Sequence, residues 1–217
     1  LDLPKEDDPS SSDSVFDIAQ EAELEEIYLV EDSIAGFLEA YTNAKELKKK
    51  LIFGLRLTFC PDLSIKSDEG RKNSFKNIIF IKNSKGYQDL IKIYTRAAQD
   101  GFYYEPRMDF KTLKNMWSND LLLAIPFYDS FLFHNLFSYK EPCILDDSFF
   151  DPVYFIEDNG LPQDIPTLEA VNSYCGDSYP TEKVKTIYYE NREDFEAYQT
   201  YKCICGRGFS TKAKTLD

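Results

Sequence analysis

The chain has 217 residues, of which 43% are hydrophobic and 15% aromatic, so it is long enough to bury one substantial core. No apolar run reaches the ~20 residues that a membrane-spanning helix needs, and the acidic, polar start does not resemble a signal peptide. The first 40 residues hold 13 acidic side chains and one basic one, whereas the other 177 hold 25 acidic and 24 basic. The composition predicts a cytoplasmic domain without the basic balance typical of nucleic-acid binding.

Two local groups of residues have simple explanations. Four lysines fall within residues 45–50; they could bind phosphates, but a solvated helix end, where cations are favourable, explains them better. Of the five cysteines only Cys203 and Cys205 are close in sequence, and the single histidine, His134, does not complete a zinc site with them. We expect reduced, mostly buried thiols.

Helices and short apolar strands alternate in the first half of the chain. Residues 11–13 can cap a helix, because the apolar side chains that follow recur at helical spacing: Val15, Ile18, Ala19 and Ala22. A short buried strand is predicted at 27–30, and a second helix follows it with one apolar face: Ile34, Phe37, Leu38 and Tyr41. A strand over 51–59, a polar loop over 61–74 and a strand over 78–81 come next.

The alternation continues in the second half. A helix follows the strand at 78–81 and presents Tyr87, Leu90, Ile91 and Tyr94, and Asp109 can cap a short helix around 113–116. Strands are predicted at 121–125, 153–156 and 184–188, and helices at 130–137, 167–174 and 193–204. This pattern predicts βαβ units in a parallel sheet, open or closed into a barrel, with a site where the carboxyl ends of the strands meet their loops.

Five stretches carry a more specific signal. They are IAGFLEAY at 34–41, LIFG at 51–54, NSKGYQDLIKIYTRA at 83–97 with GFYYEPRMD at 101–109, YFIEDNGLP at 154–162, and YYENREDFEAY at 188–198 leading into KCI. In this order they resemble the PHP domain of bacterial replicative DNA polymerase III alpha subunits, which belong to the C family. The similarity extends over about residues 14–205.

The resemblance implies an α/β fold, a distorted TIM-like (β/α)₇ barrel over residues 14–205, here without its first strand. An acidic arm (1–13) would precede the barrel, and a linker towards a palm domain (206–217) would follow it. In members of the family that keep their chemistry, His, Asp and Glu at the barrel mouth bind several metal ions and hydrolyse phosphoesters, in some cases as a 3′→5′ exonuclease.

Most positions that match the family's metal ligands hold other residue types here. The matched positions are Glu31, Arg56, Lys76, Asn159, Thr186, Tyr188 and Tyr198. A one-residue shift would offer Glu31 with Asp32 at the first of them. Ammonium and guanidinium groups cannot coordinate a metal ion. We therefore expect Arg56 and Lys76 to pair with carboxylates such as Glu31 or Glu157. The resemblance then implies no catalytic residue, no bound metal and no cofactor in this domain.

Two other groups are interpreted as structural. Glu105, Arg107 and Asp109 could form a charged catalytic trio, but they lie in a stretch that is a structural loop in the family. Trp117 and the aromatic residues between 127 and 137 could stack on bases, yet cations are not interleaved with them. We expect these rings in the core.

The implied function is that of a non-catalytic scaffold domain in a DNA-directed DNA polymerase. It would pack against the palm and thumb of the parent polymerase, which would carry out nucleotidyl transfer and engage DNA and the sliding clamp. Two alternatives remain open. One is a metal-dependent phosphoesterase or 3′→5′ exonuclease with a reduced site of Glu31, Asp32 and Glu157; the other is an interaction protein whose acidic arm binds a basic partner.

Overall fold

The computed structural model describes residues 14–138, 143, 147–189 and 191–205. They fall into two compact units, the first ending at Lys183 and the second beginning at Val184. The predicted arm (1–13) and linker (206–217) lie outside the described residues. The sheet belongs to the first unit, and the last helix of the described chain belongs to the second.

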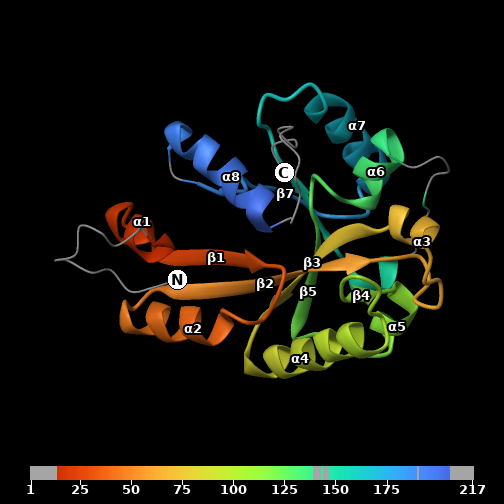
Figure 1. Cartoon of the computed structure of the whole chain (residues 1–217), viewed down its shortest axis with the longest axis horizontal. Coiled ribbons are helices and arrows are strands. Elements are labelled where there is room, and N and C mark those ends of the chain that lie inside the picture. The colour runs from red at the N-terminus through yellow and green to blue at the C-terminus, as the bar shows by residue number, and fades with distance from the viewer. Residues whose placement is uncertain (1–13, 139–142, 144–146, 190, 206–217) are drawn as a thin grey trace. The chain divides into compact units, whose positions relative to one another are not determined.

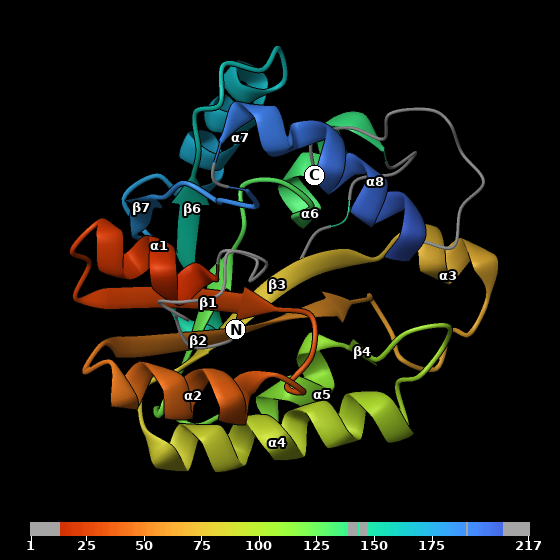
Figure 2. The same cartoon turned by 60° about the vertical axis from the view of Figure 1, so that its left-hand side comes forward.

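The strands of the first unit join one sheet in the order β1-β2-β3-β5-β6-β7, with β4 paired to β2 (Figures 1 and 2). They are β1 (Glu26–Glu31), β2 (Lys50–Phe59), β3 (Phe75–Ile81), β4 (Arg107–Met108), β5 (Leu121–Ile125), β6 (Val153–Ile156) and β7 (Thr181–Lys183). β3 is antiparallel to β2 and β5, whereas the other pairs are parallel. The expectation of a parallel sheet is therefore wrong at β3, because β2 reaches it through a loop instead of a crossover.

Several helices begin at a residue whose side chain accepts hydrogen bonds from the first turn. They are α1 (Val15–Glu21), α2 (Phe37–Glu46), α3 (Asp68–Lys72), α4 (Ser84–Gln99), α5 (Phe110–Lys114), α6 (Phe131–Phe137), α7 (Asp164–Cys175) and α8 (Phe195–Cys205), with 3₁₀ segments η1 (Ser148–Phe150) and η2 (Arg192–Asp194). Asp109 accepts a hydrogen bond from the Thr112 backbone, which confirms its predicted capping role. α3 falls inside the stretch that was predicted to be a polar loop.

The larger core lies on one face of the sheet, because side chains along a strand alternate between the two faces. β2 and α4 supply much of it: Phe53, Leu55, Leu57, Phe59, Leu90, Ile93 and Ala97. The opposite face carries a smaller cluster that includes Ile78, Phe80 and Ala124. A side chain at Gly54 would begin 2.7 Å from the Phe80 ring, so this glycine lets the ring lie against β2. The curled, open sheet with its helices agrees with the distorted TIM-like fold expected from the resemblance (Figures 1 and 2).

α1 lies alongside β1, on the side away from β2 (Figures 1 and 2). Ser14 caps it, whereas the sequence placed the cap at residues 11–13. Its buried residues are Phe16 and Ala19, so the predicted face is confirmed at Ala19 and wrong at Val15 and Ala22, which are exposed. In β1 only Ile27 is buried, which corrects the expectation of a buried strand. A helix that covers the edge of a sheet protects that edge from pairing with other chains.

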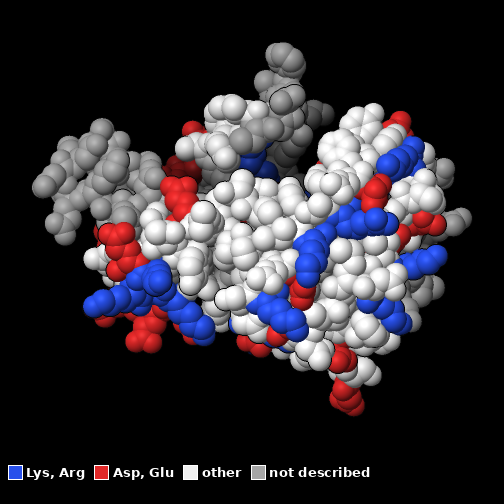
Figure 3. All heavy atoms as spheres, turned by 90° about the horizontal axis from the view of Figure 1, so that it is seen from below, with Lys and Arg blue, Asp and Glu red and all other residues white. Residues whose placement is uncertain are grey.

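α2 packs through a face that matches the prediction only in part, since Phe37 is buried as expected. Its buried residues are Phe37, Ala40 and Ala44, whereas Leu38 is 71% exposed and Tyr41 50% exposed. Ala40 and Ala44 join a small apolar cluster with Phe16, Ala19 and Ile27, and hydrophobic periodicity alone did not distinguish this face. The helix ends at Glu46, so the lysines of residues 45–50 mark a helix end as predicted. Figure 3 shows cationic side chains gathered at the left, where α2 ends.

The second unit contains η2 and α8 in its described part. The strand predicted at 184–188 is absent: these residues have no regular structure, and the short strand β7 precedes them. Within this unit the Tyr188 and Tyr198 rings stack, with centroids 5.3 Å apart. Tyr198 also lies beneath the Lys202 ammonium group.

Two further sequence expectations concern the membrane and the thiols. Among the described residues, no helix combines the length and apolar character that crossing a membrane requires. Cys60, Cys143, Cys175 and Cys203 are free thiols, and Cys60 and Cys175 are buried. Burial raises the pKa of Cys60 and of Cys175, each to about 11, which disfavours the reactive thiolate.

Candidate functional site

Four of the seven predicted site positions lie at one edge of the sheet. Glu31 closes β1, Arg56 lies towards the end of β2, and Asn159 comes shortly after β6. Lys76 lies near the start of β3, which brings it to the same edge because β3 is antiparallel to β2. The backbone N–H of Lys76 donates to the Asp129 carbonyl at 2.8 Å and ties β3 to the segment after β5.

Arg56 is held by a carboxylate. Its Nε lies 2.7 Å from Asp32 Oδ1 and its Nη2 lies 3.2 Å from Oδ2, so the guanidinium group binds with two hydrogen bonds. Partial burial would raise the pKa of Asp32, but the bonds and charge of Arg56, helped by Lys76, hold that pKa below its ordinary value. The Asp32 carboxylate is therefore already paired with a cation of its own chain.

Lys76 is held in a second group on the same face. The register places it opposite Thr58, and its Nζ donates to Thr58 Oγ1 at 2.6 Å and to Glu105 Oε2 at 3.1 Å. The Thr58 hydroxyl in turn donates to the same Glu105 oxygen at 2.7 Å. The three groups close a small hydrogen-bonded triangle at the end of β2.

Glu31 differs from its neighbour Asp32. Partial burial and the nearby Asp32 carboxylate raise the pKa of Glu31. Among the described residues it has no salt bridge. The sequence favoured Glu31 or Glu157 as partners of the cations, and the hydrogen-bonded partners in the structure are instead Asp32 and Glu105.

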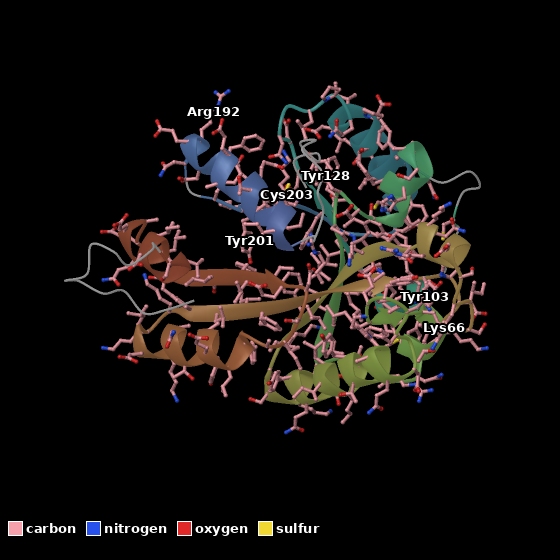
Figure 4. All side chains as sticks on the ribbon, viewed as in Figure 1. Lys66, Tyr103, Tyr128, Arg192, Tyr201 and Cys203 are labelled. Carbon is pink, nitrogen blue, oxygen red and sulfur yellow. The ribbon has the colours of Figure 1, made fainter. Side chains whose placement is uncertain are left out.

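Asn159 belongs to another network built after β5 and β6. Its side-chain amide donates to Tyr128 Oη at 3.2 Å and to the buried Glu157 at 3.3 Å. The Tyr128 hydroxyl, from the segment between β5 and α6 (labelled in Figure 4), donates to Asp164 Oδ1 at 2.6 Å. Asp164 also accepts hydrogen bonds from the backbone N–H groups of Asn159 and Leu161.

This network has clear electrostatic consequences. Burial would raise the pKa of Asp164, but the Tyr128 hydroxyl and the backbone N–H groups hold it below its ordinary value. Burial and the hydrogen bond to Asp164 raise the pKa of Tyr128, so the phenol stays protonated. Both carboxyl oxygens of Asp164 are engaged as acceptors within the loop.

The other three predicted positions belong to the second unit. Thr186 and Tyr188 lie in the irregular segment before η2, and Tyr198 lies in α8. Tyr198 contacts the rings of Tyr188 and Tyr189. These three positions therefore present a hydroxyl and two phenols, without an imidazole or a carboxylate.

The side chains at these positions do not fit a cluster of metal ions. In the parts of the chain that the structure describes, no three His, Cys, Asp or Glu side chains come together as metal ligands. Lys and Arg offer only hydrogen-bond donors, and the amide of Asn159 donates to its neighbours. The carboxylates of Asp32, Glu105 and Asp164 are engaged by donors from the chain itself.

The trio in the loop before α5 has the structural roles that the sequence suggested. Arg107 is 1% exposed and donates to the carbonyls of Gly101 and Ile65, which joins two loops. Asp109 caps α5 and also accepts from the Leu63 backbone. Glu105 has an additional role that sequence reasoning missed, because its partner Lys76 is 29 residues away and only strand register brings them together.

A cleft lies elsewhere in the first unit. It has a volume of about 430 Å³, and the residues that line it include Lys66 (labelled in Figure 4), Arg96 at the end of α4 and Lys111 in α5. None of the seven predicted positions lines it. The candidate site is thus distinct from this cleft.

Comparisons with known proteins agree with this architecture. A family model described as PHP domain matches residues 8–141. The DNA polymerase III subunit alpha of Helicobacter pylori is 35% identical over 79 residues, which cover 36% of this chain and 6% of that protein. The protein of the same name from Borreliella burgdorferi is 32% identical over 79 residues, covering 36% and 7%. That of Thermus aquaticus is 24% identical over 186 residues, covering 79% and 15%.

The matches cover much of this chain but only a small part of its relatives. The family model covers more than half of the chain, whereas the chain spans only 6–15% of the length of these relatives. The longest alignment extends beyond the family model, as expected if the similarity continues through the second half of the chain. The chain belongs to the PHP domain family and is related to the PHP domain of DNA polymerase III alpha subunits.

Proposed function

We propose that this chain is a PHP domain without hydrolytic activity of its own, which acts as a scaffold within a longer replicative DNA polymerase. The observation that supports this most directly is the bidentate Arg56–Asp32 pair at the edge where the family places metal ligands. The Lys76–Glu105 pair supports it in the same way. Cations that are neutralised inside the chain stabilise a fold without creating a centre for catalysis.

The proposal assigns the polymerase chemistry to the rest of the parent protein. The named relatives are polymerase subunits, and this chain corresponds to a small part of their length. The domain would pack against the palm and thumb of its parent in the cytoplasm, and the parent would engage DNA and the sliding clamp. It would need neither a metal ion nor a cofactor.

The test combines metal analysis with an exonuclease assay. The purified chain is dialysed with excess Mn²⁺ or Zn²⁺, its metal content is measured, and single-stranded DNA labelled at its 5′ end is offered as substrate. We expect no stoichiometric metal and no shortening of the DNA. The matched variants are Glu31→Gln at the candidate site and Glu39→Gln on the exposed surface of α2.

The opposite result would favour the phosphoesterase alternative. Metal-dependent turnover that is lost in Glu31→Gln and kept in Glu39→Gln would overturn the proposal. The scaffold role has a separate test in the full-length parent, where Arg56→Met with Lys76→Met should lower the thermal stability of DNA synthesis. An unchanged temperature profile would argue against the scaffold role.

A further inference from the structure

Two exposed aromatic rings lie in the turn that joins α4 to β4. Phe102 is 51% exposed and Tyr104 is 66% exposed. The Tyr104 backbone has a φ of 65°, in the left-handed region that a bulky residue rarely adopts. A hydrogen bond from the Tyr103 N–H to the Glu105 carbonyl, at 3.1 Å, closes the turn around it. Such strain is more typical of a loop with a function than of a simple connection.

Two arginines contact the rings of this turn. The guanidinium carbon of Arg71, in α3, lies 4.8 Å from the centre of the Tyr104 ring. The Tyr104 and Tyr103 rings meet edge to face, with their centroids 4.8 Å apart. The guanidinium carbon of Arg107, in β4, lies 5.2 Å from the centre of the Tyr103 ring. These four residues form a row with two rings between two cations, and we call them the Arg–Tyr ladder.

The two arginines of the Arg–Tyr ladder differ in what they can still bind. Neither forms a salt bridge with a carboxylate among the described residues. Arg107 is 1% exposed and donates to the carbonyls of Gly101 and Ile65, so it holds the turn against the loop before α3. Arg71 is exposed. A guanidinium group whose face lies on a ring keeps the N–H groups of its edge available, and a phosphate can accept two hydrogen bonds there.

Further polar and cationic groups accompany the exposed end of the ladder. α3 and the loop before it line a cleft of about 230 Å³, whose residues include Ile65, Ser67 and Asn73. Lys66 and Lys72, from the same segment, are exposed and have no carboxylate partner in the described parts of the chain. Figure 4 labels Lys66, together with Tyr103 from the neighbouring turn. Exposed rings and available cations thus occur together at α3.

This combination is typical of surfaces that bind single-stranded nucleic acid, because bases stack on the rings and phosphates pair with the cations. The available edge of Arg71 and the two lysines favour a chain of phosphates over an apolar protein surface. The carboxylates Asp62, Asp68 and Glu69 belong to the same stretch of sequence and reduce its positive charge. We therefore expect a weak contact that salt disrupts.

We propose that the exposed end of the Arg–Tyr ladder binds single-stranded nucleic acid. Arg71 pairs with a phosphate, and the rings of Tyr104 and Phe102 stack on bases. Arg107 stays buried and holds the turn in place. None of the seven former ligand positions takes part, so the inference goes beyond the proposed scaffold role and does not depend on it.

Fluorescence anisotropy tests the proposal with the full chain and a labelled oligothymidylate of about 20 nucleotides, a length that exceeds the usual site sizes. EDTA is present, so that metal-dependent hydrolysis cannot interfere. We expect binding at low salt that weakens as salt is added, and weaker binding of the corresponding duplex, whose bases are already stacked.

Two variants remove the proposed contacts. Tyr104→Gly deletes the ring and suits the positive φ, so the turn can keep its shape. It should weaken binding about fivefold or more. Arg71→Gln should weaken binding and also make its salt dependence less steep, because one phosphate contact is lost.

The control variants are Tyr41→Ala and Lys45→Gln, which change another exposed ring and a cation at the end of α2. They should leave the affinity unchanged, and circular dichroism should show the same folded state for all variants. Ultraviolet cross-linking to the oligonucleotide, followed by peptide mapping, should place the cross-link within residues 102–104. Absence of binding at low salt would overturn the proposal. So would unchanged affinity in both ladder variants, equal affinity for the duplex, or cross-links that map away from the turn.

Discussion

A guanidinium group close to a sheet edge needs an acceptor, because it carries a charge at any physiological pH and offers donors only. Arg56 obtains both acceptors from Asp32, although its side chain is 30% exposed and that of Asp32 60% exposed. Pairs this exposed contribute modestly to stability. The geometry is nevertheless bidentate, which favours a measurable contribution.

Replacing the guanidinium tests this pair. Arg56→Met should lower the free energy of unfolding by about 0.5–1 kcal/mol near neutral pH. The pKa of Asp32 is lowered in the folded chain, so the pair stabilises above the usual value of 3.8 and the contribution fades as pH falls through the lower folded pKa. Urea unfolding of wild type and variant should therefore converge in acid. An equal difference in acid and at neutral pH would contradict the assignment, and Arg56→Lys should retain part of the effect.

Another residue-level prediction concerns a buried amide. Asn77 in β3 is fully buried, and neither its Oδ1 nor its Nδ2 has a hydrogen-bond partner among the described residues. An unpaired polar group in such a position costs about 1–3 kcal/mol. Asn77→Val, which suits a strand, should raise the free energy of unfolding by a similar amount in urea titrations. Destabilisation would mean that the amide binds an ordered water molecule whose loss is costly.

The site residues could be predicted only in part. The sequence shows that hydrogen-bond donors replace the family's metal ligands at Arg56, Lys76 and Asn159. This prediction requires only the resemblance and the chemistry of each side chain. The partners could not be derived in this way. Adjacent residues at a strand end point to opposite sides, and this decides whether Glu31 or Asp32 becomes the partner of Arg56. The Lys76–Glu105 contact depends on strand register, because the two residues are 29 positions apart in the sequence.

At the scale of elements, a buried carboxylate connects several segments of the first unit. Asp147, just before η1, is fully buried and accepts a hydrogen bond from Tyr154 of β6. Tyr174 of α7 and Tyr179 donate to its other oxygen at 3.4 and 3.2 Å. Burial raises the pKa of Asp147 even though the three phenols oppose the rise. The hydrogen bonds to Asp147 thus connect these segments, although burying its charged carboxylate is unfavourable.

Asp147→Asn tests whether the buried carboxyl makes the folded state less stable as pH rises. A carboxyl whose folded pKa lies above its usual 3.8 makes the folded state bind a proton more readily, so its contribution to stability falls as pH rises through that window. Wild type should gain stability relative to Asp147→Asn between neutral pH and about pH 4. Denaturant unfolding at several pH values measures this difference. The opposite slope would show that the hydrogen bonds outweigh burial, and Asp151→Asn, at an exposed residue, is the control.

Elements with strong local signals were predicted well. The strands at 121–125 and 153–156 have the predicted bounds, because short apolar runs flanked by polar residues leave little ambiguity. Tertiary packing decided the rest: beside Phe37, the residues of α2 that face inward are two alanines and not Leu38 or Tyr41. The strand predicted at 184–188 failed because apolar and β-branched residues do not form a strand without a neighbouring strand to pair with.

At the scale of the whole molecule, charge is distributed unevenly along the chain. The net charge of −13 arises almost entirely within the first 40 residues. In that part, Asp32 and Glu26 are neutralised by Arg56 and Lys50 from β2. The nearly neutral remainder carries the sheet and most of the core, so its overall charge balance does not favour nucleic-acid binding.

The last prediction concerns the effect of metal ions on the thermal stability of the whole fold. A ligand that binds only the folded state at a thousand times its dissociation constant adds about 4 kcal/mol, which corresponds to a rise in melting temperature of roughly 8–16 °C for a domain of this size. The side chains at the sheet edge include cations, and the carboxylates of Asp32 and Glu105 already accept hydrogen bonds from them. We therefore expect Mn²⁺ to leave the melting temperature unchanged within about 1 °C. EDTA should likewise have no effect. A large rise that EDTA reverses would show that the acidic side chains rearrange to hold metal, and its loss in Glu31→Gln but not in Glu39→Gln would locate that metal at the end of β1.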